Sequence, residues 1–407
     1  MPLQFSNIRS FYFNNKGFVV FSIVLFFLIY ILENINHRFW LNDYKVYYEA
    51  AKALREGRQV YGIPFGLETG YYKYSPLIAM LFIPFSLLPY YLASSIHYLV
   101  IAIVSISVIL LSMKMINTYV FKTVPNKSNI LMILSLLAIM RHLFRELHLG
   151  NLNMIIVFIL SLGLLYSFRS KYLYSGICMG LAIMIKPYFL LLIIPFILYK
   201  QFRTVWYTGV TLAVSFLIPM IFFGFKDGLG LHQEWFAAMQ AHSTYLNSSE
   251  TIQSIIQYYF YAGLPDIFQL LIIGMVVILY FWYFIFTKSK DIENTDNEYV
   301  DSKYMFVGFF CLLAIIPNIL ITDTEHFLFA LPLIVLLIHH LSFTKNYLEI
   351  GLFALLILLP SCNTPDLLGH DLANKFDKMG MLGLTNLGII AFAVYVSLRF
   401  KLKANLS

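Results

Sequence analysis

Charged residues and cysteines are scarce in this chain. Of its 407 residues only 12% are charged and three are cysteine, whereas 60% are hydrophobic. A soluble protein of this length cannot bury so large an apolar fraction, and three cysteines provide neither a disulfide framework nor a metal-ligand spacing. The composition therefore excludes an ordinary soluble domain and predicts a membrane protein.

The sequence also lacks the motifs of soluble catalysis. It contains no phosphate-binding glycine-rich loop, no nucleophile elbow and no paired-histidine zinc helix. Its formal charge of +7 does not indicate nucleic-acid binding, because most Lys and Arg fall in short loops between apolar segments, as is typical of cytoplasmic loops. We expect no nucleic-acid partner, and the sequence offers no clear metal site.

Apolar segments recur along the whole chain, which predicts an all-α polytopic membrane protein. The alternating strands of a transmembrane barrel are absent. We expect a single integral-membrane domain over residues 1–407, with twelve spans and both termini in the cytoplasm. The spans are predicted at residues 17–35, 92–113, 129–144, 152–168, 172–185, 188–199, 204–224, 266–287, 304–321, 327–343, 347–361 and 380–398.

Two long segments, residues 36–75 and 225–265, are predicted to be loops on the external face. The second contains one Lys and no Arg, which supports an external position. The apolar residues 76–90 are interrupted by Pro84 and Pro89. We interpret them as a membrane-dipping helix of the first loop, although the sequence leaves open whether they cross.

The first strongly polar stretch, residues 42–57, has the pattern of an amphipathic helix on a membrane surface. Asn42 or Asp43 stands where a helix N-cap is expected, and Gly57 where a helix ends. Asp43 is therefore either only a cap or a carboxylate placed at the water–lipid boundary for chemistry. Capping and catalysis are compatible.

Polar residues gather at the external ends of the predicted spans, where ionisable groups are costly unless they are paired or functional. Each group also has a structural explanation: a snorkelling Lys73, a turn capped by Gly150, a kink at Lys186 or an interfacial His326. Because all lie on one side, we expect a single external cavity. The groups are Asp43, Lys73, Arg145 to Asn153 with Lys186, and Asp323 to His326.

The order of these motifs resembles that of the multi-span GT-C glycosyltransferases that use lipid-phosphate sugars. Within them, the chain is most similar to the polyprenyl-phosphate-mannose-dependent α-(1→2)-mannosyltransferases, glycosyltransferase family 87. The family usually has Gly-Gln-x-Asn and Pro-Pro at two of these motifs, where this chain has Gly150-Asn151-Leu152-Asn153 and Ser75-Pro76. The matching motifs are Asn42-Asp43-Tyr44, Tyr47-Tyr48-Glu49-Ala50-Ala51, Val60-Tyr61, Tyr72-Lys73-Tyr74-Ser75-Pro76, Leu88-Pro89, Gly150-Asn151-Leu152-Asn153, Gly180-Leu181-Ala182 and Lys186-Pro187.

The resemblance implies a GT-C-type helical bundle in which Asp43 is the catalytic base and His326 contacts the donor phosphate. It implies transfer of a mannose-like hexose from a polyprenyl phosphate to a lipid or glycan hydroxyl, in one inverting displacement, at the external face of a bacterial inner membrane. No metal cofactor is expected, because cationic side chains can balance the single phosphodiester charge. The expected substrate-binding residues are Lys73, Tyr74, Arg145, His148, Asn151, Asn153, Lys186 and His326.

Other membrane proteins share this composition. A transporter or flippase of lipid-linked saccharides predicts internal repeats with paired broken helices, and the pattern of residues 42–76 has no second copy. A polysaccharide polymerase predicts a late external loop rich in Arg and His, whereas residues 225–265 contain two His and no Arg. The flippase stays the alternative to a hexosyltransferase.

Overall fold

The computed structural model describes residues 15–66, 70–125, 127–242, 248–261, 263–265, 267–289 and 297–404. Helices dominate this part of the chain, and its one β interaction is an isolated bridge between Pro64 and Tyr71. The helices are α2 (Lys16–Ile35), α3 (Asn42–Arg55), α4 (Pro76–Ser86), α5 (Tyr90–Met115), η1 (Ile116–Val120), α6 (Ser128–Ala138), α7 (Met140–Leu149), α8 (Asn153–Phe168), α9 (Tyr172–Ile185), η2 (Pro187–Leu192), α10 (Ile193–Leu198), α11 (Phe202–Phe223), α12 (Phe225–His242), α13 (Ile252–Tyr259), α14 (Ile267–Ser289), α15 (Asn297–Ala314), α16 (Ile316–Ile319), η3 (Thr324–Ala330), α17 (Leu331–Thr344), α18 (Tyr347–Ser361), α19 (Pro365–Leu368), α20 (His370–Lys378) and α21 (Met381–Ala404).

Six helices among the described residues are long and apolar enough to cross a membrane, so the chain is a polytopic membrane protein. They differ in burial. The span of η3 and α17 is 78% buried and that of α5 is 72% buried, whereas α2 and α11 are each 22% buried. The first two therefore form the centre of the bundle, and the last two present apolar side chains to lipid. The six are α2, α5, α11, α14, η3 with α17, and α21.

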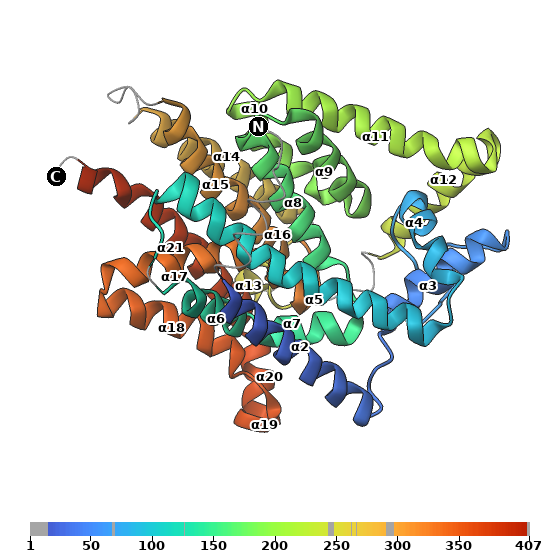
Figure 1. Ribbon diagram of the computed structural model, residues 1–407, viewed down its shortest axis with the longest axis horizontal. Coiled ribbons are helices and arrows are strands. Elements are labelled where there is room, and N and C mark those ends of the chain that lie inside the picture. Colours follow the sequence, from blue (N-terminus) through green and yellow to red (C-terminus); the bar gives the residue numbers. More distant parts are fainter. Residues whose placement is uncertain are drawn as a thin grey trace.

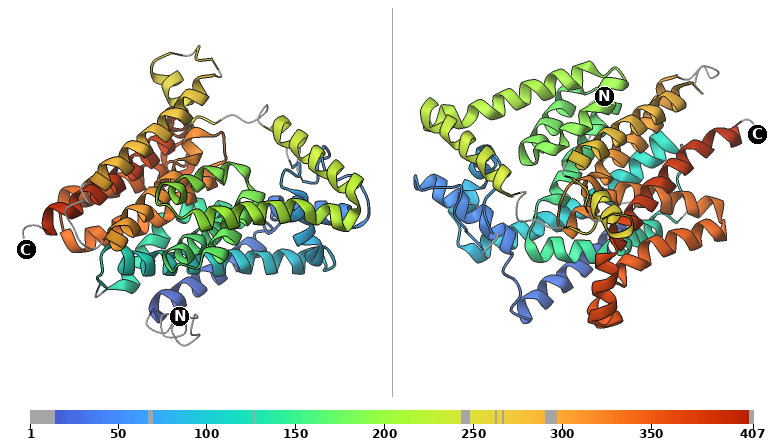
Figure 2. Two further views of the ribbon diagram at one scale, coloured as in Figure 1. Left: turned by 90° about the horizontal axis from the view of Figure 1, so that it is seen from above. Right: turned by 180° about the vertical axis from the view of Figure 1, so that it is seen from behind.

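Parts of the two segments predicted to be external lie together. In Figures 1 and 2, α3, α4 and α12 occupy one end of the molecule, and the C-terminal ends of α5, α14 and α21 lie at the opposite end. Contacts join α4 to both α3 and α12. The buried apolar side chains form one continuous cluster from Phe18 to Val396.

The other predicted spans coincide with shorter helices, so the twelve-span topology stays a prediction. One of them, 129–144, was wrong as a continuous helix. Helix α6 ends at Ala138, and α7 is a separate amphipathic helix that meets α8 at a bend of 113°. Because α7 carries Arg141, Arg145 and Glu146 within ten residues, it cannot extend an apolar span across lipid. The predicted span 188–199 also begins as a 3-10 turn, η2.

Helix α3 confirms the periodicity of residues 42–57 but corrects two details. Its buried face, which includes Tyr47 and Leu54, packs against α4 inside the protein and does not rest on lipid. The residue before the helix is Leu41, with φ 44°, so neither Asn42 nor Asp43 is the N-cap, and Asp43 lies in the first turn. Gly57 has φ +67° directly after the helix end, as predicted.

Candidate functional site

The site is assembled where the end of α7 meets the start of α3. Helix α7 ends at Leu149, and the next residue, Gly150, has φ +68°. A Cβ atom at this position would lie 2.8 Å from Cβ of Tyr44 and 3.1 Å from Cβ of Leu41. Only glycine permits both this backbone conformation and this close approach. The contact brings the next residue, Asn151, within reach of Asp43.

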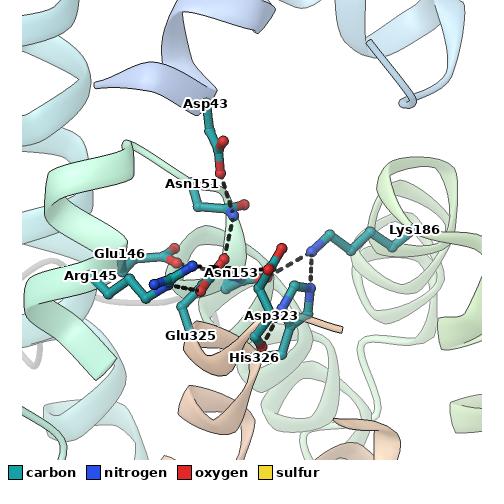
Figure 3. Close-up of polar contacts among 9 residues, drawn as sticks. All are labelled: Asp43, Arg145, Glu146, Asn151, Asn153, Lys186, Asp323, Glu325 and His326. Atoms are coloured by element: carbon teal, nitrogen blue, oxygen red, sulfur yellow. Dashed lines mark hydrogen bonds and ion pairs between the residues drawn. The ribbon is translucent and has the colours of Figure 1, made fainter. Parts of the chain in front are cut away.

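The Asn151 amide links three segments of the chain (Figure 3). Its Nδ2 donates to Oδ2 of Asp43 at 2.9 Å and to Oε1 of Glu325 at 3.3 Å. Its Oδ1 accepts from the Tyr47 hydroxyl at 3.3 Å and from the Leu152 amide at 2.7 Å. Both ends of the side chain are therefore satisfied, which fixes its orientation between the two carboxylates.

An ion pair with Arg145 continues the network from Glu325. The Glu325 side chain is inaccessible to solvent, and its Oε2 accepts from Nε of Arg145 at 2.8 Å. Nη2 of the same arginine lies 3.9 Å from Oδ1 of Asp323. Arg145 is half exposed, so its guanidinium faces the carboxylates on one side and open space on the other. An arginine shared between two acids holds η3 against α7.

Asn153 connects a second buried acid to a buried lysine. Glu146 accepts hydrogen bonds from Nδ2 of Asn153 and from the Met154 amide, each at 2.9 Å. Oδ1 of Asn153 accepts from Nζ of Lys186 at 2.8 Å. Glu146, Asn153 and Lys186 come from α7, α8 and the end of α9, so these hydrogen bonds tie three helices together.

His326 completes the environment of the Lys186 ammonium. Its Nδ1 lies 3.1 Å from the backbone oxygen of Asp323, and its Nε2 lies 2.7 Å from Nζ of Lys186. A carbonyl oxygen only accepts, so Nδ1 carries the proton and Nε2 accepts from the ammonium. In the described part of the chain, no carboxylate oxygen lies within 4.0 Å of Nζ of Lys186. The buried cation is held by neutral partners alone.

The charges of Asp43 and Lys73 act on each other, and the pKa values of both are shifted. Burial and then the negative charge of Glu325 raise the pKa of Asp43 to about 6, against the attraction of Lys73. Burial lowers the pKa of Lys73, and the charge of Asp43 opposes that shift. Asp43 is consequently a stronger base than an ordinary aspartate and is about 90% ionised at pH 7.

Tyr74 joins the network from the loop before α4. Its hydroxyl lies 3.1 Å from that of Tyr47, which in turn donates to Asn151. The backbone oxygen of Lys73 accepts from Nε1 of Trp235 on α12 at 3.1 Å. The second segment predicted to be external thus contributes to positioning the first.

The structure brings most of the predicted site residues together, but it places His148 outside the network. His148 contacts Oε2 of Glu33 at 2.9 Å and Nε1 of Trp40 at 3.3 Å, so it fastens α7 to α2 outside the network. The expected catalytic and substrate-binding residues did not include Glu146, Glu325 or Tyr47. The first two lie within the polar clusters that the sequence singled out, Arg145 to Asn153 and Asp323 to His326, and Tyr47 lies in a matching motif. Within the described chain, no group of three or more His, Cys, Asp or Glu is arranged for a metal ion.

A polytopic helical bundle that holds acidic and basic side chains in one polar network is typical of a membrane protein with a functional site. The sequence model of glycosyltransferase family 87 matches residues 72–302, more than half of the chain. The chain belongs to glycosyltransferase family 87 and is a membrane glycosyltransferase, which confirms the resemblance noted in its motifs. No curated protein matches the chain. The matched range contains Lys73 and Lys186 and excludes Asp43 and His326, so the roles expected of the last two stay predictions.

Proposed function

We propose that the protein transfers a mannose-like hexose from a polyprenyl-phosphate sugar to a hydroxyl of a lipid or glycan acceptor. The observation that carries this proposal is a network of hydrogen bonds and ion pairs between Asp43, a carboxylate with a raised pKa, and Lys186, a buried cation with neutral partners. The path between them runs through Asn151, Glu325, Arg145, Asp323 and His326. A base for the acceptor and a cation for the donor phosphate are the two groups that such a transfer needs.

The donor phosphate is a phosphodiester with one negative charge. A buried ammonium without a carboxylate partner is costly, and an anion beside Lys186 would offset that cost. His326 would contact the same phosphate, and Lys73 and Arg145 would add positive charge around it. These charges stabilise the departing polyprenyl phosphate as the bond between C1 and the phosphate oxygen breaks.

The acceptor hydroxyl would approach C1 from the side of Asp43. As its oxygen forms the new bond to C1, its proton passes to the Asp43 carboxylate, and the polyprenyl phosphate leaves with the electron pair of the broken bond. One displacement inverts the configuration at C1. Asn151 holds the base in place through its hydrogen bond to Oδ2. Tyr47 and Tyr74 orient Asn151 in turn, and Asn153 orients Lys186.

The charge balance also bears on cofactors. One phosphodiester charge can be met by Lys186 together with Lys73 or Arg145, so the proposed reaction does not require a divalent metal. We place the site on the external face, in a bacterial inner membrane, because residues 225–265 carry one Lys and no Arg, whereas the predicted cytoplasmic segments hold 16 of the 28 basic residues. Such a reaction would serve the synthesis of a cell-envelope glycan.

The test uses purified protein in lipid nanodiscs with labelled polyprenyl-phosphate hexoses and candidate acceptors. We expect release of free polyprenyl phosphate and transfer of label by the wild type, and loss of both in Asp43→Asn. Glu49→Gln is the matched control, because it removes another carboxylate from α3. Movement of intact donor across the bilayer without release of polyprenyl phosphate would instead establish the flippase alternative.

A further inference from the structure

A polar cavity lies beside the proposed transfer site. It has a volume of about 530 Å³ and is enclosed by the segment before α13, by α13, by the first turns of α14 and by residues 318–321. Hydroxyl and amide side chains form most of its wall, together with three isoleucines, and none of the described residues that line it is charged. The volume lies within the roughly 300–1,000 Å³ of small-molecule sites.

Two glutamines on the same side of α13 line this cavity. Gln253 and Gln257 are four residues apart on the helix and both line the space. Neither amide makes a hydrogen bond to any residue that the structure describes. A third amide, Gln269 of α14, donates from Nε2 to the Ile319 oxygen and keeps its own carbonyl oxygen for other partners. These groups are available to a ligand.

The opposite wall of the cavity is built by internal hydrogen bonds. Nδ2 of Asn318 donates to the backbone oxygens of Glu250 and Gly383, at 3.2 and 3.0 Å, and its Oδ1 accepts from Asn386. The Glu250 carboxylate accepts from the Gly383 amide at 2.6 Å. Every polar group of Asn318 is thus used within the protein, which fixes this wall before any ligand binds.

The chemistry of the cavity selects its ligand. The described lining residues carry no charge and therefore give no compensation for a phosphate or a carboxylate. Paired amide donors and acceptors match the hydroxyl groups of a sugar, which both donate and accept. The donor hexose cannot be this ligand, because its C1 is bonded to the phosphate and must lie beside the cations.

One continuous segment of the chain connects the cavity to the proposed transfer site. Ile321 lines the cavity, and Asp323 of the cationic network follows two residues later, at most about 7 Å along the backbone. Glu325 then reaches Asp43 through Asn151. A glycan with several sugar units can therefore occupy the cavity with one part and reach toward Asp43 with another.

We propose that this cavity binds the non-reacting sugar units of the acceptor glycan, so that the acceptor is an uncharged oligosaccharide and not a single small alcohol. The proposal rests on the proposed function in naming the glycan as acceptor. The binding site itself, a neutral carbohydrate site held by Gln253 and Gln257, can be tested without any transfer reaction.

The binding test titrates neutral hexose di-, tri- and tetrasaccharides into the protein in lipid nanodiscs, because the sugar headgroups of maltoside detergents would compete. Calorimetry and saturation-transfer NMR report the affinity. The double variant Gln253→Met and Gln257→Met fills the same volume without amide groups. We expect it to bind about tenfold more weakly, since at least two hydrogen bonds are lost. The exposed Gln233→Ala on α12 is the matched control and should bind as the wild type does.

The kinetic test separates this inference from the proposed function. In the transfer assay, the double variant should raise the acceptor KM about tenfold and leave the donor KM unchanged. If the double variant does not fold, each single variant should raise the acceptor KM about threefold. Wild-type protein that binds the oligosaccharides without cleaving any donor would refute the proposed function and retain the carbohydrate site. If the wild type and the variants all cleave the donor and the two substitutions leave the acceptor KM unchanged, the carbohydrate site is refuted.

Discussion

Replacing Asp43 by Asn should make the protein more stable at neutral pH. The Asp43 pKa of about 6, against about 3.9 for a free aspartate, corresponds to about 3 kcal/mol of cost for keeping this carboxylate charged in the folded protein. The side chain is partly exposed, so screening by solvent reduces the expected gain to about 1–3 kcal/mol. Asparagine keeps an oxygen that can accept from Nδ2 of Asn151, so the hydrogen bond is retained.

The gain should depend on pH in a defined direction. Below about pH 4 the carboxyl is protonated in both the folded and the unfolded protein, and the two proteins should be nearly equal in stability. Between about pH 4 and pH 6 the unfolded wild type loses its proton before the folded wild type does. The stability of the wild type relative to Asp43→Asn therefore falls over this window, and above about pH 6.5 the difference is constant.

The assay is thermal unfolding of the wild type and of Asp43→Asn in one detergent at a series of pH values. The variant should melt a few degrees higher at pH 7 and nearly together with the wild type at pH 4. Glu49→Gln on the same helix controls for the loss of one negative charge. If Asp43→Asn melts below the wild type at pH 7, Asp43 is stabilised by the cations around it, and the argument for a strained base is refuted.

Three further predictions concern the donor site, the backbone and the cofactor. Lys186→Met should lower kcat/KM for the donor about 10²–10³-fold. The control is Lys226→Met, at an exposed position of α12, which should leave kcat/KM unchanged. Equal effects of the two substitutions would refute the proposal that Lys186 binds the donor phosphate. Gly150→Ala should destabilise the protein by about 1–3 kcal/mol, because its Cβ would meet Tyr44 and its φ is positive; Gly209→Ala, with no atom within 4 Å of its Cβ, should be neutral or stabilising in a thermal melt. Chelation of divalent ions by EDTA should leave transfer unchanged, and recovery of a lost rate on adding Mg²⁺ or Mn²⁺ would contradict the side-chain charge balance.

Much of the fold follows from local pattern. The apolar segments of the sequence recur as helices, and α3 and its end at Gly57 follow from a three- and four-residue periodicity and a glycine that accepts positive φ. Periodicity cannot say what covers an apolar face. The face of α3 that the sequence assigned to lipid packs on α4, because side chains suited to lipid are equally suited to a protein interior.

The span predicted at 129–144 shows a second limit. Hydropathy averages over a window and does not register that Arg141, Arg145 and Glu146 gather in one helix of ten residues. The structure places that helix at 113° to α8, where its polar side can meet η3 and α3. A polar cluster at the end of an apolar run therefore marked a turn of the chain.

The members of the site were partly visible in the sequence because they lie at span ends on one predicted side. Which of these residues contact one another could not be predicted from the sequence. Asn151 bridges Asp43 and Glu325, residues 282 positions apart in the numbering of the printed chain, and only the packing of α7 against α3 brings them together. Likewise His148 has the same local context as Arg145, but its position on α7 directs it to Glu33.

The central claim is that Asp43 acts as the base of the transfer and not as a ligand of the donor. The most direct measurement compares donor binding with single-turnover transfer in the wild type and in Asp43→Asn, with labelled polyprenyl-phosphate hexose and excess acceptor. We predict unchanged donor affinity and a chemical step slowed about 10²–10⁴-fold in the variant. A variant that transfers the hexose at nearly the wild-type rate, or that loses donor binding instead of the chemical step, would contradict the claim.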